Sequence, residues 1–115
     1  MDDILVIDDD EHILWLMDQI LTRRGYSVKT AGNGIEGMRL FDENRRFKLV
    51  ITDIRMPEAD GNQVAKYMKG KEAMKTTPII AISAYPDDAE RGLFDSILEK
   101  PFSIEDLAAA VDSFS

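Results

Sequence analysis

Three short apolar runs of the chain each end at a polar side chain that could take part in chemistry. Asp8 and Asp9 follow the first run, Asp53 follows the second, and Ser83 follows the third. An acid at such a place is, taken alone, more often a helix-start or turn residue than a ligand. Two carboxylates at 4 Å repel by roughly 4 kcal/mol at an effective dielectric of 20. If the fold gathers these acids, a hard divalent cation such as Mg²⁺ would relieve that repulsion.

Lys100 would bring a positive charge to the same group of acids. It follows a weaker apolar run, Ser96-Ile97-Leu98. A carboxylate that accepts a phosphoryl group needs its own charge and that of the donor neutralised, and a lysine beside Mg²⁺ provides this. The short hydroxyl of Ser83 could hydrogen-bond the new phosphate, with the small Ala84 leaving it room. These residue types suit phosphoryl transfer to an aspartate, provided that the fold brings them together.

The spacing of apolar residues predicts elements that would bring them together. Runs that are apolar on both faces fit parallel strands covered by helices on both sides. Strands and helices alternate along the chain, which predicts an α/β fold with a doubly wound, five-stranded parallel sheet. If the strand order is 2-1-3-4-5, the first and third strands are neighbours and their acids meet where the order reverses. The expected strands are residues 4–7, 26–31, 49–52, 79–82 and 96–98, and the expected helices are 11–24, 35–41, 60–68, 85–92 and 103–111.

Composition limits the class of protein. The 115 residues suffice for one domain, and the absence of cysteine excludes disulfide scaffolds and thiol chemistry. A net charge of −8 disfavours direct binding to nucleic acid and suits a basic partner surface or divalent cations. The apolar runs are too short to span a membrane, and no signal-peptide pattern begins the chain. We therefore expect a cytoplasmic, soluble domain.

Four motifs in order make the chain similar to the receiver domains of two-component response regulators, the CheY-like family. Asp9 and Asp53 are 44 residues apart and Asp53 and Ser83 are 30 apart, as in that family. The resemblance covers essentially residues 1–115, which we expect to form one receiver domain, and it implies a flavodoxin-like fold. The motifs are Val6-Ile7-Asp8-Asp9-Asp10, Thr52-Asp53-Ile54-Arg55-Met56-Pro57 with Asp60-Gly61, Ile82-Ser83-Ala84 and Glu99-Lys100-Pro101-Phe102.

The resemblance implies a role for each site residue. Asp53 would accept a phosphoryl group from a histidine kinase or phosphotransfer protein of a phosphorelay, and Ser83 and Lys100 would hold the phosphoryl oxygens. The Lys100–Pro101 bond would be cis. An output protein, or an effector domain beyond the C-terminus, would respond to the phosphoprotein. The Mg²⁺ ligands would be Asp8, Asp9, Asp53 and the backbone carbonyl of Arg55.

The sequence departs from the family between Ser83 and Lys100. Only 17 residues separate the two, which leaves room for a fourth helix of about two turns. Ile97 stands where the family usually carries a switching Tyr or Phe, and Tyr85 or Phe94 could take that role. The large side chains of Arg55 and Tyr85 flank the phosphosite and could shield an acyl phosphate from water.

Two other functions compete with this interpretation. A haloacid-dehalogenase-type phosphohydrolase also forms an aspartyl phosphate, but its motif does not place a histidine where His12 stands, and the chain has no cap insertion. A degenerate receiver would act as an unphosphorylated protein-binding module. We expect no enzymatic activity beyond self-phosphorylation and self-dephosphorylation at Asp53. Trp15 lies opposite the apolar stripe of its helix, as a partner contact or an incidental exposed aromatic.

Overall fold

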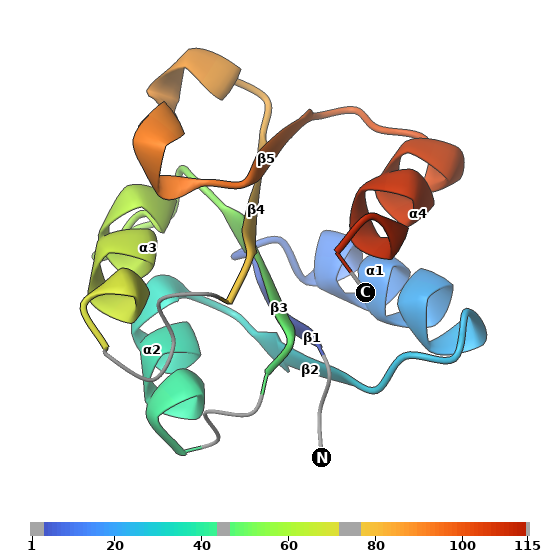
Figure 1. The fold of residues 1–115 in the computed structure, drawn as a ribbon, viewed down its shortest axis with the longest axis horizontal. Coiled ribbons are helices and arrows are strands. Elements are labelled where there is room, and N and C mark those ends of the chain that lie inside the picture. The colour runs from blue at the N-terminus through green and yellow to red at the C-terminus, as the bar shows by residue number, and fades with distance from the viewer. Residues whose placement is uncertain (1–3, 44–46, 72–76, 115) are drawn as a thin grey trace.

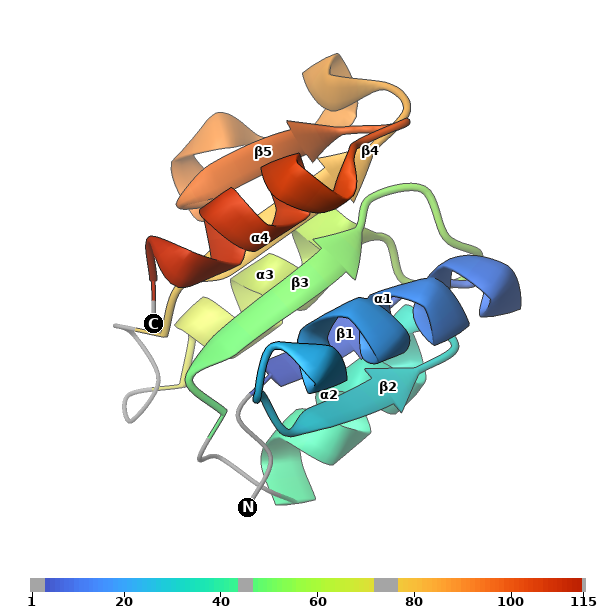
Figure 2. The same cartoon turned by 90° about the vertical axis from the view of Figure 1, so that its right-hand side faces the viewer.

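The computed structural model describes residues 4–43, 47–71 and 77–114. Five parallel strands form one sheet in the order β2-β1-β3-β4-β5. Their bounds are β1 Ile4–Ile7, β2 Val28–Ala31, β3 Leu49–Asp53, β4 Ile79–Ser83 and β5 Ser96–Glu99. The α-helices are α1 Glu11–Arg23, α2 Gly34–Glu43, α3 Gly61–Lys69 and α4 Ile104–Asp112. Helices α2 and α3 cover one face of the sheet and α1 and α4 cover the other (Figures 1 and 2). The predicted doubly wound α/β fold and its strand order are confirmed.

The two faces of the sheet carry separate apolar cores because successive side chains of a strand point to opposite faces. On one face, Leu5 and Ile7 pack with Phe41 of α2 and Met68 of α3. On the other face, the alternate strand residues pack against α1 and α4. Strands β1, β3 and β4 are buried along their whole length. This double covering is why their sequences are continuous apolar runs.

Polar residues set the starts of α1 and α3. The side chain of Asp10 accepts hydrogen bonds from the backbone N–H groups of His12 and Ile13, at 2.9 and 3.3 Å. Asp60 and Gln63 form a reciprocal capping box at the start of α3, which satisfies two backbone donors. Trp15 is 59% exposed on α1, as its position in the helical pattern predicts.

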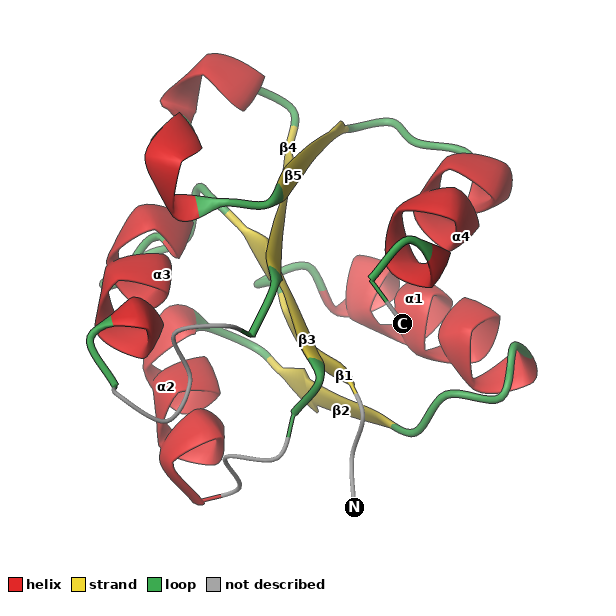
Figure 3. Cartoon of the chain, in the orientation of Figure 1, coloured by secondary structure: helices red, strands yellow, loops and turns green. Residues whose placement is uncertain are grey.

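The second strand and the fourth helix differ from their predicted forms. The strand β2 begins at Val28 and not at Tyr26, although the carbonyl of Ser27 still accepts a hydrogen bond from the N–H of Ile4 at 3.0 Å. The segment predicted as a short α-helix at 85–92 forms two 3₁₀ turns instead, η2 Pro86–Asp88 and η3 Arg91–Leu93 (Figure 3). The extended backbone at Ala89 and Glu90 separates the two turns, so no continuous helical ladder forms.

No helix in the described ranges has both the length and the apolar character needed to cross a membrane.

Candidate functional site

The acids predicted to meet do so at the carboxyl edge of the sheet. Strands β1 and β3 pair with Ile7 opposite Thr52, so Asp8 and Asp53 follow side by side. Asp8 is fully buried and Asp53 is 7% exposed, whereas Asp9 lies at the surface. One carboxylate oxygen from each of the three lies within 4.8 Å of the others. This set of hard oxygen donors is of the kind that holds a divalent cation.

Lys100 completes the cluster from the end of β5. Its Nζ lies 3.0 Å from Oδ2 of Asp8 and 3.3 Å from Oδ2 of Asp53. The backbone of Lys100 is held in turn by β4, because its N–H donates to the carbonyl of Ser83 at 2.9 Å. The peptide bond between Lys100 and Pro101 is cis, as the resemblance implied. One ammonium group thus bridges two buried carboxylates.

Each carboxylate is also oriented by a backbone N–H group. Oδ1 of Asp53 accepts from the N–H of Ile54 at 2.8 Å, and Oδ1 of Asp8 accepts from the N–H of Asp10 at 2.9 Å. In both residues the other oxygen, Oδ2, is the one that faces Lys100. The two oxygens of Asp53 therefore have different surroundings before any ligand is bound.

Burial dominates the electrostatics of the site. Desolvation, followed by the nearby charge of Asp8, raises the pKa of the Asp53 carboxyl from 3.8 to about 6, and Lys100 opposes that rise. Desolvation also raises the pKa of Asp8. Burial lowers the pKa of Lys100, but the hydrogen bond and charge of Asp8, together with Asp53, outweigh it and leave that pKa raised. A cation at the site would favour the charged form of both acids.

Ser83 lies 1% exposed at the end of β4, beside Asp53 in the sheet. Its Oγ accepts a hydrogen bond from the backbone N–H of Tyr85 at 2.9 Å. Because that oxygen is the acceptor, the hydroxyl proton is available to a second partner. All five side chains predicted for the site thus lie at one edge of the sheet, at or just after the ends of β1, β3, β4 and β5: Asp8, Asp9, Asp53, Ser83 and Lys100.

The rim of the site, formed by Arg55, Asn62, Tyr85 and Asp88, contains contacts that sequence patterns did not reveal. Arg55 pairs with Asp88 through its Nε, and its guanidinium carbon lies 3.8 Å from the centre of the Tyr85 ring. Asn62 of α3 donates to the carbonyl of Asp88 and accepts from the N–H of Glu90, both at 2.8 Å. The large side chains at 55 and 85 were singled out by size, but no sequence signal linked Asn62 or Asp88 to them.

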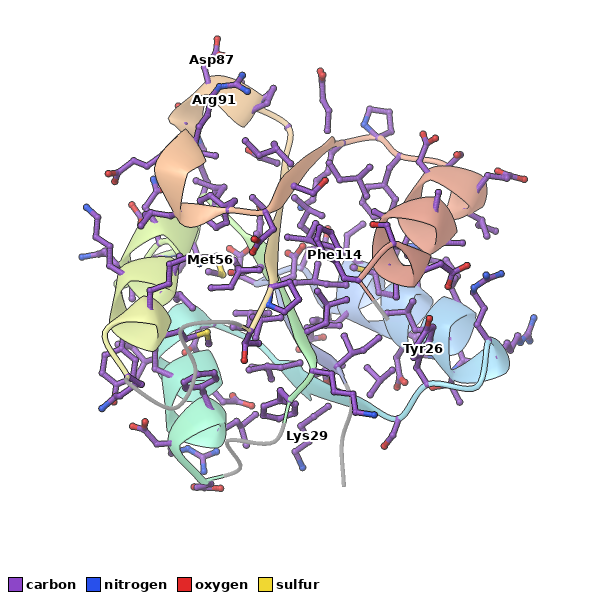
Figure 4. All side chains as sticks on the ribbon, viewed as in Figure 1. Tyr26, Lys29, Met56, Asp87, Arg91 and Phe114 are labelled. Atoms are coloured by element: carbon purple, nitrogen blue, oxygen red, sulfur yellow. The ribbon has the colours of Figure 1, made fainter. Side chains whose placement is uncertain are left out.

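The 86–93 segment is thus fastened to α3 and to the loop after β3. Lys66 adds an ion pair with Glu90 at 3.1 Å. Asp87 and Arg91 point outward from the two turns (Figure 4), whereas Ala89 is buried against Ile54 and Ala81. The segment therefore covers one side of the loop after β3, although it does not form the α-helix predicted at 85–92.

Comparison with known proteins identifies the family. The family model described as "Response regulator receiver domain" matches residues 4–112. The chain is 38% identical over 113 residues to the transcriptional regulatory protein GlrR of Escherichia coli K12, covering 95% of this chain and 25% of that regulator. It is 28% identical to the polar-differentiation response regulator DivK of Brucella anthropi, covering 96% of this chain and 94% of DivK.

A solved structure agrees in both fold and sequence. The response regulator protein TrrA of Thermotoga maritima, crystallised in complex with Mg²⁺ and BeF, has a TM-score of 0.89 and 33% identity, with 100% of each chain covered.

In contrast, the present chain spans only a quarter to a half of the transcriptional regulators that it matches, with 25% of GlrR and 46% of the regulator GltR of Pseudomonas aeruginosa covered. The family match over 4–112, with the acidic cluster at the edge of the predicted sheet, means that this chain belongs to the response regulator receiver domain family.

Proposed function

We propose that residues 1–115 form one receiver domain in which Asp53 accepts a phosphoryl group from the phosphohistidine of a histidine kinase or phosphotransfer protein. The phosphorylated domain then signals to an output protein, or to an effector domain of a longer protein. The observation that carries the proposal is the placement of Lys100, whose Nζ lies within 3.3 Å of Oδ2 of both Asp53 and the buried Asp8. A cation there offsets the charge that otherwise keeps a carboxylate from an anionic donor.

The transfer creates one bond and breaks one. An oxygen of Asp53 attacks the phosphorus of the donor, and the bond from phosphorus to the imidazole nitrogen breaks. The electron pair of that bond returns to the nitrogen, and the phosphoryl group remains on Asp53 as an acyl phosphate. In self-dephosphorylation, water attacks the same phosphorus, the bond to the Asp53 oxygen breaks, and phosphate and the carboxylate are released. No other substrate is turned over.

The residues present fit a magnesium ion. The oxygens of Asp8, Asp9 and Asp53 lie close enough to share one cation, and the backbone carbonyl of Arg55 is our fourth proposed ligand. When bound, Mg²⁺ supplies positive charge between the carboxylate and the donor phosphate. The Mg²⁺ in the TrrA structure, at 33% identity, supports this assignment. Since phosphodonor kinases of this kind act inside the cell, we infer a cytoplasmic location.

Ser83 and Lys100 would hold the transferred group. The hydroxyl of Ser83 can donate its free proton to one phosphoryl oxygen while its Oγ keeps the bond from the N–H of Tyr85. Lys100 can pair with another phosphoryl oxygen, because its Nζ already lies 3.3 Å from the accepting carboxylate. Both groups face the phosphoryl oxygens, whose negative charge increases during transfer. A hydrogen-bond donor that is already fixed in place stabilises such a transition state most.

Intact mass spectrometry after incubation with acetyl phosphate tests the proposal. One added phosphoryl group is expected with Mg²⁺, and none with a chelator or in Asp53→Ala. If no adduct forms, beryllofluoride with Mg²⁺ is added, because it would reveal a competent site whose phosphate is lost too fast to see. Failure of both would refute the phosphoacceptor function. It would favour a receiver that binds partners unphosphorylated, an alternative supported by Ile97 and by the two 3₁₀ turns that stand in place of the α-helix predicted at 85–92.

A further inference from the structure

We propose that Thr52 is a positioning residue for the phosphoacceptor: it orients the peptide between Asp53 and Ile54, and that peptide selects Oδ2 of Asp53 as the oxygen presented to the phosphoryl donor. The inference rests on the proposed function, which it deepens. Thr52 is fully buried in β3, and its Oγ1 donates a hydrogen bond to the backbone carbonyl of Asp53 at 2.8 Å.

Thr52 does not reach the site itself. Successive residues of a strand point to opposite faces, so the side chain of Thr52 lies on the face of Val50, which packs with α2 and α3. The side chain of Asp53 points to the other face. Any effect of the Thr52 hydroxyl on chemistry must therefore pass through the backbone.

The geometry of a peptide bond provides that route. The carbonyl of Asp53 and the N–H of Ile54 are opposite ends of one planar unit. Thr52 holds the carbonyl end, and the N–H at the other end donates to Oδ1 of Asp53 at 2.8 Å. A fixed carbonyl thus fixes the direction of the N–H, which occupies Oδ1 and leaves Oδ2 beside Lys100.

Gly61 restricts the same peptide from α3. Its N–H donates to the carbonyl of Ile54, which belongs to the next peptide unit along the chain, at 2.8 Å. A Cβ at this position would lie only 2.3 Å from the carbonyl oxygen of Asp53 and 2.9 Å from Cα of Ile54. The helix can approach this closely only because residue 61 has no side chain, so the peptide has little room to rotate.

The matched test uses Thr52→Val, which keeps the shape of the side chain and removes the hydroxyl, and Thr52→Ser, which restores it. Thr30→Val removes a hydroxyl from β2, away from the site, and is the control. With acetyl phosphate and saturating Mg²⁺, we expect Thr52→Val to phosphorylate about tenfold more slowly than wild type. The phosphorylation rate of Thr52→Ser should lie within about twofold of the wild-type rate. The rate of Thr30→Val should equal that of wild type.

Amide hydrogen exchange separates positioning from a general loss of stability. The ratio of amide exchange at Ile54, just after β3, to exchange at Val50, within β3, should rise in Thr52→Val and not in Thr52→Ser or Thr30→Val. A loss of global stability alone cannot raise the ratio, because it speeds exchange at Val50 in the sheet core at least as much as at Ile54. Should Thr52→Val not fold, Gly61→Ala is the second variant, and it should raise the same ratio by displacing the Asp53 carbonyl.

Each outcome decides the inference. A wild-type rate in Thr52→Val, or an unchanged exchange ratio, overturns it while leaving the phosphoacceptor function intact. If wild type neither takes up a phosphoryl group nor binds beryllofluoride with Mg²⁺, the proposed function fails. The exchange ratio then still reports whether Thr52 orients the peptide.

Discussion

Replacing Asp53 with asparagine is expected to change how the stability of the domain depends on pH. In the folded protein, desolvation raises the pKa of this carboxyl to about 6, against 3.8 for the exposed side chain. The folded state therefore binds the proton at higher pH than the unfolded state does. As pH falls from about 7 towards 4, protonation of Asp53 raises the free energy of unfolding, and above pH 7 that contribution is absent.

The size of the effect follows from the two pKa values. A difference of about two units corresponds to about 3 kcal/mol once titration is complete. About 2 kcal/mol of this falls between pH 7.5 and pH 4.5. Asparagine has nearly the same shape and stays neutral throughout. The advantage of Asp53→Asn over wild type in free energy of unfolding should therefore be greatest at pH 7.5 and smaller by about 2 kcal/mol at pH 4.5.

Urea unfolding at the two pH values, in chelator, measures this difference. The subtraction of variant from wild type cancels the titration of every shared carboxyl that does not interact with Asp53, and Asp8, whose charge contributes to the raised pKa of Asp53, is the exception. Asp87→Asn is the matched control, because Asp87 is exposed at the tip of η2 (Figure 4) and should show no such change. A difference between wild type and Asp53→Asn that is the same at both pH values would refute the reasoning.

Further outcomes follow from the rim, the metal ligands and the core. Asn62→Leu should lower the free energy of unfolding by about 2 kcal/mol, because the partly buried backbone groups of Asp88 and Glu90 lose their hydrogen-bond partner, and urea unfolding measures this change. Joint replacement of Arg55 and Tyr85 by alanine should speed loss of phosphate from Asp53, seen as phosphate release; an unchanged rate would mean that their stacked side chains do not shield it. Added Mg²⁺ should raise the melting temperature of wild type and not that of Asp8→Asn. Phe41→Ala should cost about 4 kcal/mol of stability in the same unfolding assay.

Sequence patterns predicted the centre of the sheet and the chemistry at its edge for one physical reason. Parallel strands covered on both faces must be apolar throughout, so the first polar residue after each run marks the end of the strand. Asp8, Asp53 and Ser83 were found in this way. Strands at the sheet margin carry a weaker pattern, which is why the start of β2 was placed two residues early, at Tyr26 in place of Val28.

Contacts between distant residues could not be read from local patterns. The conformation of the 86–93 segment depends on Asn62, which is 26 residues before Asp88 and belongs to another helix. The same holds for the ion pair between Arg55 and Asp88, which lie 33 residues apart. The number of residues between Ser83 and Lys100 indicated a shortened connection, but two 3₁₀ turns and a short α-helix need similar lengths of chain.

The attachment of the 86–93 segment also determines how the domain can open. An α-helix must lose its own backbone hydrogen bonds to unfold. The 86–93 segment is instead attached to the rest of the domain through the side chains of Asn62, Arg55 and Lys66. Detaching the segment as one unit requires release of those contacts and of the packing of Ala89 and Leu93 on the core, and it leaves the sheet paired. Such a unit has a free energy of opening well below that of global unfolding. The 86–93 segment can therefore separate from the rest of the domain on its own timescale. This separation uncovers Ala89 and the edge of the loop after β3 while the fold remains intact.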